Sequence, residues 1–347
     1  MTIKSIPICI SLLIMMTFAA CPVSGVESGP RIIEDTQVLM GTTVRIQAPV
    51  ASDKDAAVAR EAINKAFKEI ARIENVFSVF KADSEVSRIN KVKAGEPVPV
   101  SAEAFGLIER SVECSKKTEG AFDVTVKPLV DLWREAGKSK KLPPAEAIAA
   151  AVNKVGSRYL LLDKAKSTIT FQKDGMGLDF GGIAKGYATD RVVAVLKESG
   201  ISNALISSGG NTYCLGMKGE KEMWKVGIQH PRDKNKVFAV LRLKDKAIDT
   251  SGDYEKYFIL HGRRYSHIID PRTGYPIGDN VVSATVVADS AANADMFATA
   301  LCVLGADGSR MADSLGLDAL LIIKDGEKLK TEMAGGFKEQ YGKAKKK

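Results

Sequence analysis

Two oxygen-bearing side chains stand one helical turn apart in an apolar stretch near the end of the sequence. Residues 290–301 read SAANADMFATAL, so Asp295 and Thr299 interrupt a run of Ala, Met, Phe and Leu. Residues four apart lie on the same face of an α-helix, so a carboxylate and a hydroxyl would converge on one place. The spacing predicts either a capped ion pair or a metal site.

A second candidate is one of the three histidines in the chain. His267 lies in SHIIDPRTGYP, residues 266–276, whose DPRTG segment is typical of a turn. A single histidine of this kind is either structural or, at a strand end beside a charged turn, a general base, because its pKa lies near the operating pH. Asp270, in the same turn, is the second candidate for the base.

Two glycine-rich turns could hold phosphate groups. They are LDFGGIAKGYATD, residues 178–190, and ISSGGN, residues 206–211. Tyr187 and Ala188 stand where a Walker A motif requires Lys and then Ser or Thr, so a P-loop is excluded. No G-x-G-x-x-G follows a strand, which argues against a Rossmann dinucleotide fold. Each turn is either a tight structural turn or, at a helix N-terminus, a phosphate site, and two together would suit a diphosphate.

The elements that must position these residues follow from hydrophobic periodicity. The pattern predicts helices over 54–77, 102–120, 184–199 and 290–301. It predicts strands over 38–48, 167–171, 176–180, 203–208, 281–288 and 319–323, and several between Trp224 and Ile269, including a hairpin at His261–Gly262. This mixed order favours an α+β fold, a single catalytic domain with a mixed, largely antiparallel sheet and flanking helices, over a doubly wound sheet.

Composition limits the function classes. With 347 residues, 45% apolar content and a formal net charge of +8, the chain is globular and is not a disordered protein. Its basic residues are scattered, and only Lys343, Lys345, Lys346 and Lys347 cluster, in the tail. Since no nucleic-acid motif or aromatic platform accompanies the charge, we expect no nucleic-acid binding; a basic surface would instead attract an anionic small molecule.

The N-terminus is typical of an export signal. Residues 1–20 combine Lys4 with a short apolar segment, and the following Cys21 stands in a sequence, Phe18-Ala19-Ala20-Cys21, that resembles a bacterial lipobox. We therefore expect an exported, membrane-anchored lipoprotein on the periplasmic side, with residues 21–35 as the lipidated Cys and a linker. Ordinary signal cleavage is the alternative.

The remaining cysteines indicate no metal or disulfide framework. Cys9 would leave with the signal, and Cys114, Cys214 and Cys302 are widely separated and have no C-x-x-C spacing. This distribution is typical neither of a zinc site nor of a disulfide-stapled domain.

Six motifs occur in one order: MGTTV, GAFDVTVKPLVDLW, LDFGGIAKGYATDR, ISSGGN, HIIDPRTGYP and DSAANADMFATAL. Together they resemble the ApbE family, the FAD:protein FMN transferases, over about residues 36–325. The resemblance implies a single α+β domain, residues 36–335, that binds FAD as substrate together with Mg²⁺, followed by a basic tail, residues 336–347.

The resemblance also assigns residues. Asp295 and Thr299 match the family's magnesium ligands, joined by the backbone carbonyl of Ala184. The positions that match FAD contacts are Met40, Phe80, Ala121, Phe122, Asp123, Lys185, Tyr187, His267 and Ile269. Phe80 departs from the tyrosine expected there, which leaves a stacking role and removes a hydroxyl contact.

The implied reaction is attack by a Thr or Ser hydroxyl of an acceptor protein on the FMN-side phosphorus of FAD, with release of AMP. His267 would take the hydroxyl proton. The family's acceptors are subunits of membrane redox complexes that carry covalent FMN. Two alternatives remain open: an FAD diphosphatase that gives FMN and AMP, and a non-catalytic flavin-binding lipoprotein.

Overall fold

The computed structural model describes residues 31–341 except 234, 279–280 and 327. The expected signal segment, Cys21 and the tail lysines therefore lie outside the described residues. Among the described helices, none combines the length and apolar content that a membrane span requires.

An eight-stranded sheet forms the centre of the molecule, and every neighbouring pair in it is antiparallel. The strand order is β1-β2-β6-β7-β10-β13-β14-β15. The bounds are β1 (Arg31–Leu39), β2 (Thr42–Val50), β6 (Ala204–Ser208), β7 (Asn211–Leu215), β10 (Lys246–Gly252), β13 (Val281–Ala288), β14 (Asp318–Asp325) and β15 (Lys328–Ala334).

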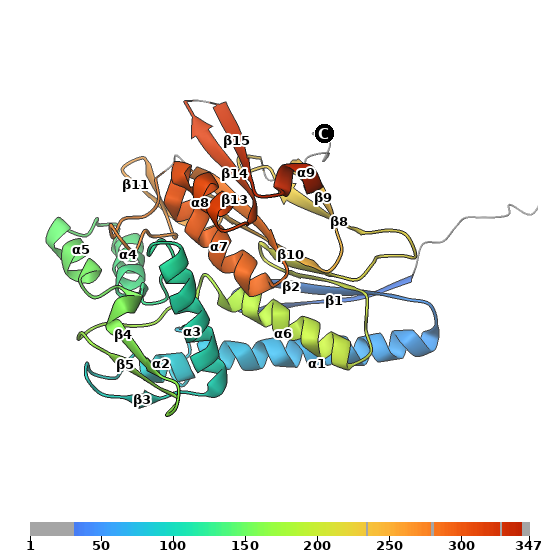
Figure 1. Cartoon of the computed structure of the whole chain (residues 1–347), viewed down its shortest axis with the longest axis horizontal. Helices are drawn as coiled ribbons and strands as arrows, with labels where there is room; N and C mark the ends of the chain where they lie inside the picture. Colours follow the sequence, from blue (N-terminus) through green and yellow to red (C-terminus); the bar gives the residue numbers. More distant parts are fainter. Residues whose placement is uncertain (1–30, 234, 279–280, 327, 342–347) are drawn as a thin grey trace, which may run out of the picture.

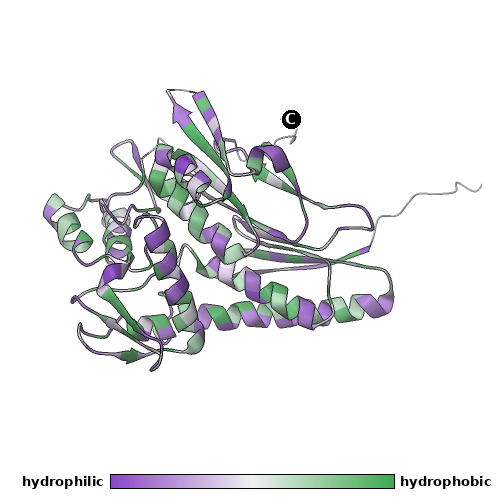
Figure 2. Ribbon diagram, viewed as in Figure 1, coloured by the Kyte–Doolittle hydropathy of each residue, from purple (hydrophilic) through white to green (hydrophobic). Residues whose placement is uncertain are grey.

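Three helices pack side by side on one face of this sheet: α1 (Asp53–Phe77), α6 (Ala184–Glu198) and α7 (Ala291–Leu304) (Figure 1). Helix α1 begins after Ser52, whose hydroxyl accepts from the Asp55 amide, and it buries an apolar stripe at helical spacing. Helix α7 is apolar almost throughout (Figure 2), because it is covered by its neighbours on nearly all sides. A charged residue within it therefore requires a partner.

The opposite face of the sheet is covered by the hairpin β8 (Trp224–Gln229) and β9 (Val237–Leu243) and by helix α9 (Phe337–Tyr341). Since both faces are covered, β7 and β13 are buried along almost their whole length. The central strands therefore lack the alternation of a half-exposed strand.

A smaller group of elements packs beside the helical layer (Figure 1). It contains α2 (Glu85–Ile89), α3 (Ala102–Lys117), α4 (Lys127–Ser139), α5 (Ala145–Val152) and the three-stranded sheet of β3 (Val98–Pro99), β4 (Leu160–Asp163) and β5 (Thr168–Phe171). The hairpin β11 (Tyr257–Leu260) and β12 (Arg263–Ser266) and the short α8 (Gly308–Ser314) complete the described elements, with 3₁₀ turns at Ser157–Tyr159 and Gly305–Asp307.

The expected α+β fold with a largely antiparallel sheet is confirmed, as are the helices at 54–77, 102–120, 184–199 and 290–301 within a few residues. The expected strand over 38–48 is instead a hairpin. Its chain reverses at Met40 and Gly41, both of which have positive φ. The hairpin expected at His261–Gly262 is present, with the same backbone signature.

Three expectations about the chain's organisation are wrong. The strand expected over 176–180 is absent because the side chain of Asn90 bonds both the amide and the carbonyl of Leu178, which replaces a strand partner. Part of the expected linker is sheet, since β1 begins at Arg31. The expected tail contains α9, whose Phe337 is buried against the sheet.

Candidate active site

The N-terminus of α6 meets the side of α7 at Asp295. This aspartate is 1% exposed, and its Oδ2 accepts a hydrogen bond from the backbone amide of Gly186 at 2.9 Å. The ammonium of Lys185 lies 3.3 Å from Oδ1. A carboxylate at a helix N-terminus is stabilised by the free amides and by the helix dipole. Asp295 is therefore both a cap and a member of an ion pair, the first of the two expected alternatives.

Thr299 lies one turn further along α7, facing the turn that precedes α6. Its Oγ1 is 3.3 Å from the hydroxyl of Ser251 on β10, and a Cβ built on Gly182 would stand 3.2 Å from the same oxygen. Glycine at 182 therefore allows the turn to approach Thr299 closely. The expected convergence of Asp295 and Thr299 with the first glycine-rich turn is present.

Sequence reasoning missed a second buried carboxylate, Asp249 on β10. It is 2% exposed, and its Oδ1 has no hydrogen-bond partner among the described residues. Burial, and then the charge of Asp295, raise the pKa of Asp249, whereas the charge of Lys185 lowers it. The signal in the sequence was an acidic residue in the buried strand segment KAIDTSG.

Lys185 balances this concentration of negative charge. Burial opposes its ammonium form, but the carboxylates of Asp295, Asp249 and Glu255 outweigh burial and raise the pKa of Lys185. Lys185 is charged at neutral pH and is surrounded by acceptors. It is the one residue of the glycine-rich motif whose charge could also meet a phosphate.

The oxygen donors gathered here fit a hard cation. The described residues contain no group of three His, Cys, Asp or Glu side chains placed to hold a metal. A site built from one carboxylate, one hydroxyl and a backbone carbonyl needs no such group, and Mg²⁺ commonly rests on one or two carboxylates with water and substrate phosphates. The buried Oδ1 of Asp249, which has no hydrogen-bond partner among the described residues, is a further oxygen beside this site.

Two residues can supply the backbone carbonyl. Ala184 is the first residue of α6, so its carbonyl points along the helix. Gly182 lies before the helix and against Thr299. The amide four residues later, that of Gly186, donates to Asp295 instead of completing a helical bond to the carbonyl of Gly182. The Gly186 amide therefore does not occupy the Gly182 carbonyl, while Ala184 stays a prediction.

The second glycine-rich turn adjoins the same site. A Cβ built on Gly210 would stand 2.8 Å from the Thr250 carbonyl and 3.1 Å from Glu255 Oε1, so no side chain fits there. Gly209 has a φ of +63°, which favours glycine. Both turns therefore border the cluster of Lys185, Asp249 and Glu255.

His267 follows β12, and its ring is held by a backbone carbonyl. Its Nδ1 lies 2.9 Å from the carbonyl of Lys256, and a carbonyl only accepts, so Nδ1 carries the proton. Nearby protein displaces water around the ring and lowers the pKa to about 4; the Lys256 carbonyl opposes this shift, and the charge of Lys185 adds to it. His267 is therefore neutral at pH 7, and Nε2 is its unprotonated ring nitrogen.

The alternative base, Asp270, is engaged in its turn. Its carboxylate accepts from the backbone amide and the guanidinium of Arg272, each at 2.9 Å. Ile269 beside it is 6% exposed and packs in a cluster with Leu129 and Trp133. These contacts are those of a structural turn that supports the strand end before it.

Other residues expected at FAD divide by position. Phe122 lies next to Gly182, 3.1 Å from a Cβ built there, and Ala121 beside it is buried. Met40 stands in the β1–β2 turn with a φ of 52°. The Phe80 ring is 78% exposed, with the guanidinium of Arg134 4.8 Å from its centroid.

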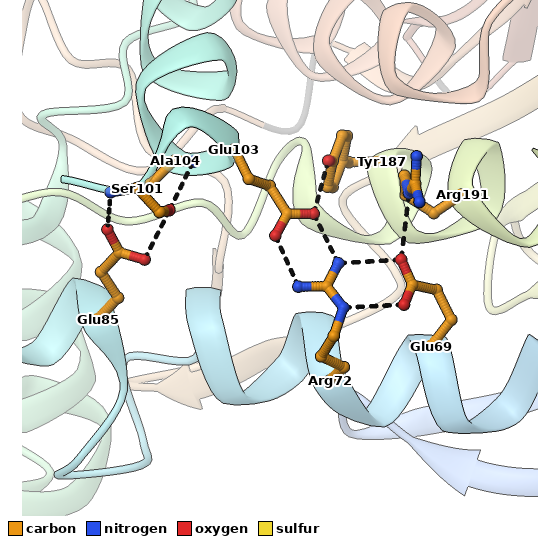
Figure 3. Close-up of polar contacts among 8 residues, drawn as sticks. All are labelled: Glu69, Arg72, Glu85, Ser101, Glu103, Ala104, Tyr187 and Arg191. Atoms are coloured by element: carbon orange, nitrogen blue, oxygen red, sulfur yellow. Dashed lines mark hydrogen bonds and ion pairs between the residues drawn. The ribbon is translucent and has the colours of Figure 1, made fainter. Parts of the chain in front are cut away.

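Two of the expected contacts have side chains directed elsewhere. The carboxylate of Asp123 accepts from Ser115, Thr125 and the amide of Ser157, so it holds a buried loop together. The Tyr187 hydroxyl donates to Glu103 on α3 at 2.7 Å, within a network that includes Arg72 (Figure 3). A role for these two residues in binding FAD stays a prediction.

A family model described as the ApbE family matches residues 40–321, which include the central sheet from β2 into β14. The chain belongs to the ApbE family. Among its ApbE relatives, the FAD:protein FMN transferase of Escherichia coli K12 is 36% identical over 305 residues, which cover 86% of each chain. That of Haemophilus influenzae is 31% identical over 339 residues, covering 95% of this chain and 96% of the relative.

Solved ApbE structures share the fold. The flavinyl transferase ApbE of Pseudomonas stutzeri, in its apo form, has a TM-score of 0.80 at 30% identity, with 91% of this chain and 99% of that chain covered. The ApbE protein of Thermotoga maritima has a TM-score of 0.81 at 34% identity, with 90% and 99% covered. The whole domain, not one motif, is therefore that of an ApbE protein.

Proposed function

We propose that this chain is an FAD:protein FMN transferase, which moves FMN from FAD to a Thr or Ser hydroxyl of an acceptor protein and releases AMP. The observation that carries the proposal is the match of 305 residues, at 36% identity and over 86% of each chain, to a protein of that name. The assembled site supports it, since a neutral histidine, a half-buried lysine and a cation-compatible oxygen cluster lie together.

His267 is the general base in this proposal. As the acceptor hydroxyl oxygen forms its bond to the FMN phosphorus, its proton passes to Nε2 of His267. The bond from that phosphorus to the bridging oxygen breaks, and AMP leaves with the electron pair. The bond from Nδ1–H to the Lys256 carbonyl fixes the tautomer that makes Nε2 the acceptor.

Magnesium is the proposed metal, held by Asp295, Thr299 and a carbonyl of the first glycine-rich turn. The close approach of Gly182 to Thr299, and a Gly186 amide that bonds Asp295 instead of the Gly182 carbonyl, support a ligand there, beside the predicted Ala184. When bound, Mg²⁺ supplies positive charge next to the diphosphate. With the carboxylate of Asp295 serving as a metal ligand, Lys185 would be free to meet a phosphate oxygen.

We further propose that the mature chain is exported and anchored by lipid at Cys21, with acceptors among subunits of membrane redox complexes. The lipobox-like sequence supports the anchor. A Cys21→Ser variant should move from the membrane to the soluble fraction after cell fractionation. A native chain found soluble, with an unmodified N-terminus by mass spectrometry, contradicts the anchor.

The transfer reaction is tested by incubating the purified chain with FAD, MgCl₂ and an acceptor domain, then weighing the acceptor by mass spectrometry. His267→Ala should bind FAD but lose at least about 100-fold in transfer rate, the lower range for a positioned base. His261→Ala, at the exposed tip of the β11–β12 hairpin, is the matched control and should transfer normally. If both variants lose transfer rate equally, or if neither loses it, the assignment of His267 as the base is contradicted.

A further inference from the structure

Helices α6 and α7 cap each other. Asp295 of α7 accepts from the amide of Gly186 in the first turn of α6. In return, the carboxylate of Asp190 on α6 accepts from the amides of Ala291 at 2.7 Å and Ala292 at 3.1 Å, the first two residues of α7. Each helix therefore satisfies, with one carboxylate, the free amides at the start of the other.

The cap of α7 is a small network. Ser290, its N-cap residue, donates to Asp190 at 2.7 Å and accepts from the Asn293 amide. The guanidinium of Arg110 on α3 bonds both the Ser290 hydroxyl, at 2.5 Å, and the Asn293 side chain. The start of α7 is therefore fixed from two neighbouring helices.

The two helices touch through their backbones where the caps lie. A Cβ on Gly186 would stand 2.3 Å from the Ala291 carbonyl oxygen. Because the backbones of α6 and α7 are in direct contact at this point, the reciprocal caps set the relative position of the two helices. Asp295 lies just four residues after Ala291, and Thr299 one turn beyond it.

We propose that Asp190 is a positioning residue for the cation site, although it touches neither the cation ligands nor the substrate position. It holds the first turn of α7, and thereby keeps Asp295 and Thr299 opposite the turn that precedes α6. The inference rests on the proposed magnesium site. Loss of the Asp190 carboxylate should weaken Mg²⁺ binding beyond any effect on the overall stability of the fold.

The test compares two carboxylates that act at helix N-termini. Asp190→Asn removes the charge that caps α7. Glu85→Gln is the matched control, because Glu85 accepts from the amide and hydroxyl of Ser101, the N-cap residue of α3 (Figure 3). Mg²⁺ binding to the full-length mature chain is measured by titration calorimetry, and unfolding of each variant by urea.

We expect Asp190→Asn to raise the Mg²⁺ dissociation constant about tenfold, the size of effect of losing a good cap. Glu85→Gln should change it by less than about twofold while losing comparable stability. In the transfer assay, Asp190→Asn should raise the Mg²⁺ concentration needed for half-maximal rate and leave the rate at saturating Mg²⁺ near that of the native chain. If Asp190→Asn does not fold, Ser290→Ala removes a weaker part of the same cap and should raise the constant about threefold.

If the native chain binds Mg²⁺ and the folded cap variant, Asp190→Asn or Ser290→Ala, binds it with the same dissociation constant, the inference is overturned and the proposed function is left intact. A native chain that shows no Mg²⁺ binding overturns the proposed metal site, and the inference with it. A loss of saturating rate with an unchanged Mg²⁺ requirement also overturns the inference, since it assigns Asp190 a different role.

Discussion

Gly186 lies where α6 and α7 touch, so Gly186→Ala tests the account of that junction. The added Cβ would meet Ala291 O at 2.3 Å, Ala291 C at 2.6 Å and Ala292 Cα at 2.7 Å, all backbone atoms. Ordinary contact begins at 3.4 Å, so the helices must separate by about 1.1 Å. Overpacking of this kind costs about 3 kcal/mol, the upper end of the usual range, and the gain in helix propensity returns about 1 kcal/mol.

We therefore expect Gly186→Ala to lose about 2 kcal/mol of unfolding free energy, seen as a fall in Tm of about 3 °C by calorimetry, since the unfolding entropy of a domain of this length is about 0.65 kcal/mol/K. Gly106→Ala is the opposite case, because Gly106 is exposed on α3 and a Cβ there meets nothing within 4 Å. That variant should gain up to about 1 kcal/mol. A Gly186→Ala protein as stable as Gly106→Ala would refute the close approach of the two helices.

Three further predictions concern charge. Because the pKa of His267 is lowered to about 4, transfer should be independent of its titration from pH 5 to 7 and should fall only as pH drops through about 4; an inflection near 6.5 in the rate profile would contradict this. Hydrogen bonds from Arg72, then from Arg191, outweigh burial and lower the pKa of Glu69 from 4.5 to about 2. The contribution of the Glu69 carboxylate to the stability of the fold is therefore complete above pH 4.5 and is lost as pH falls toward 2. The stability difference between the native chain and Glu69→Gln, about 1 kcal/mol at pH 7 in urea unfolding, should therefore vanish near pH 2, and a constant difference would contradict the ion pairs. Asp123→Ala leaves the buried donors of Ser115, Thr125 and Ser157 without an acceptor and should cost about 3 kcal/mol, whereas a loss below 1 kcal/mol in the same assay would show that the carboxylate is not structural.

The fold could be predicted where periodicity reflected burial on one side. Helix α1 buries residues at helical spacing and exposes those between them, so its bounds could be predicted from the sequence to within one residue. The segment 176–180 is apolar and has the composition of a strand, yet its backbone is satisfied by a side chain from residue 90. A partner that distant in sequence leaves no local signal.

The same division holds for the candidate site. The shared face of Asp295 and Thr299 could be predicted because one helix carries both, at a fixed spacing. Asp249 could not, because its importance arises from its approach to Asp295 and Lys185, which three separate elements bring about. The destinations of the Asp123 and Tyr187 side chains also depend on tertiary contacts, with Ser157 and Glu103 respectively.

The position of the cap by Asp190 shows a further limit. Its motif, GYATDR, carries no mark that distinguishes a surface aspartate from one that binds the start of another helix. Only the crossing of α6 and α7, a hundred residues apart in sequence, makes the bond to Ala291 possible. Local patterns predict which residues share a face, and packing decides what that face meets.

The central claim is that FAD loses its FMN moiety to a protein hydroxyl and not to water. The most direct measurement follows AMP release from FAD and Mg²⁺ with the native chain, with and without an acceptor domain that carries the target Thr, and weighs the acceptor at each time. The account predicts slow AMP release without acceptor, faster release with it, and one FMN bound to the acceptor for each additional AMP. Equal AMP release in both reactions, with free FMN and an unmodified acceptor, would contradict it and identify an FAD diphosphatase.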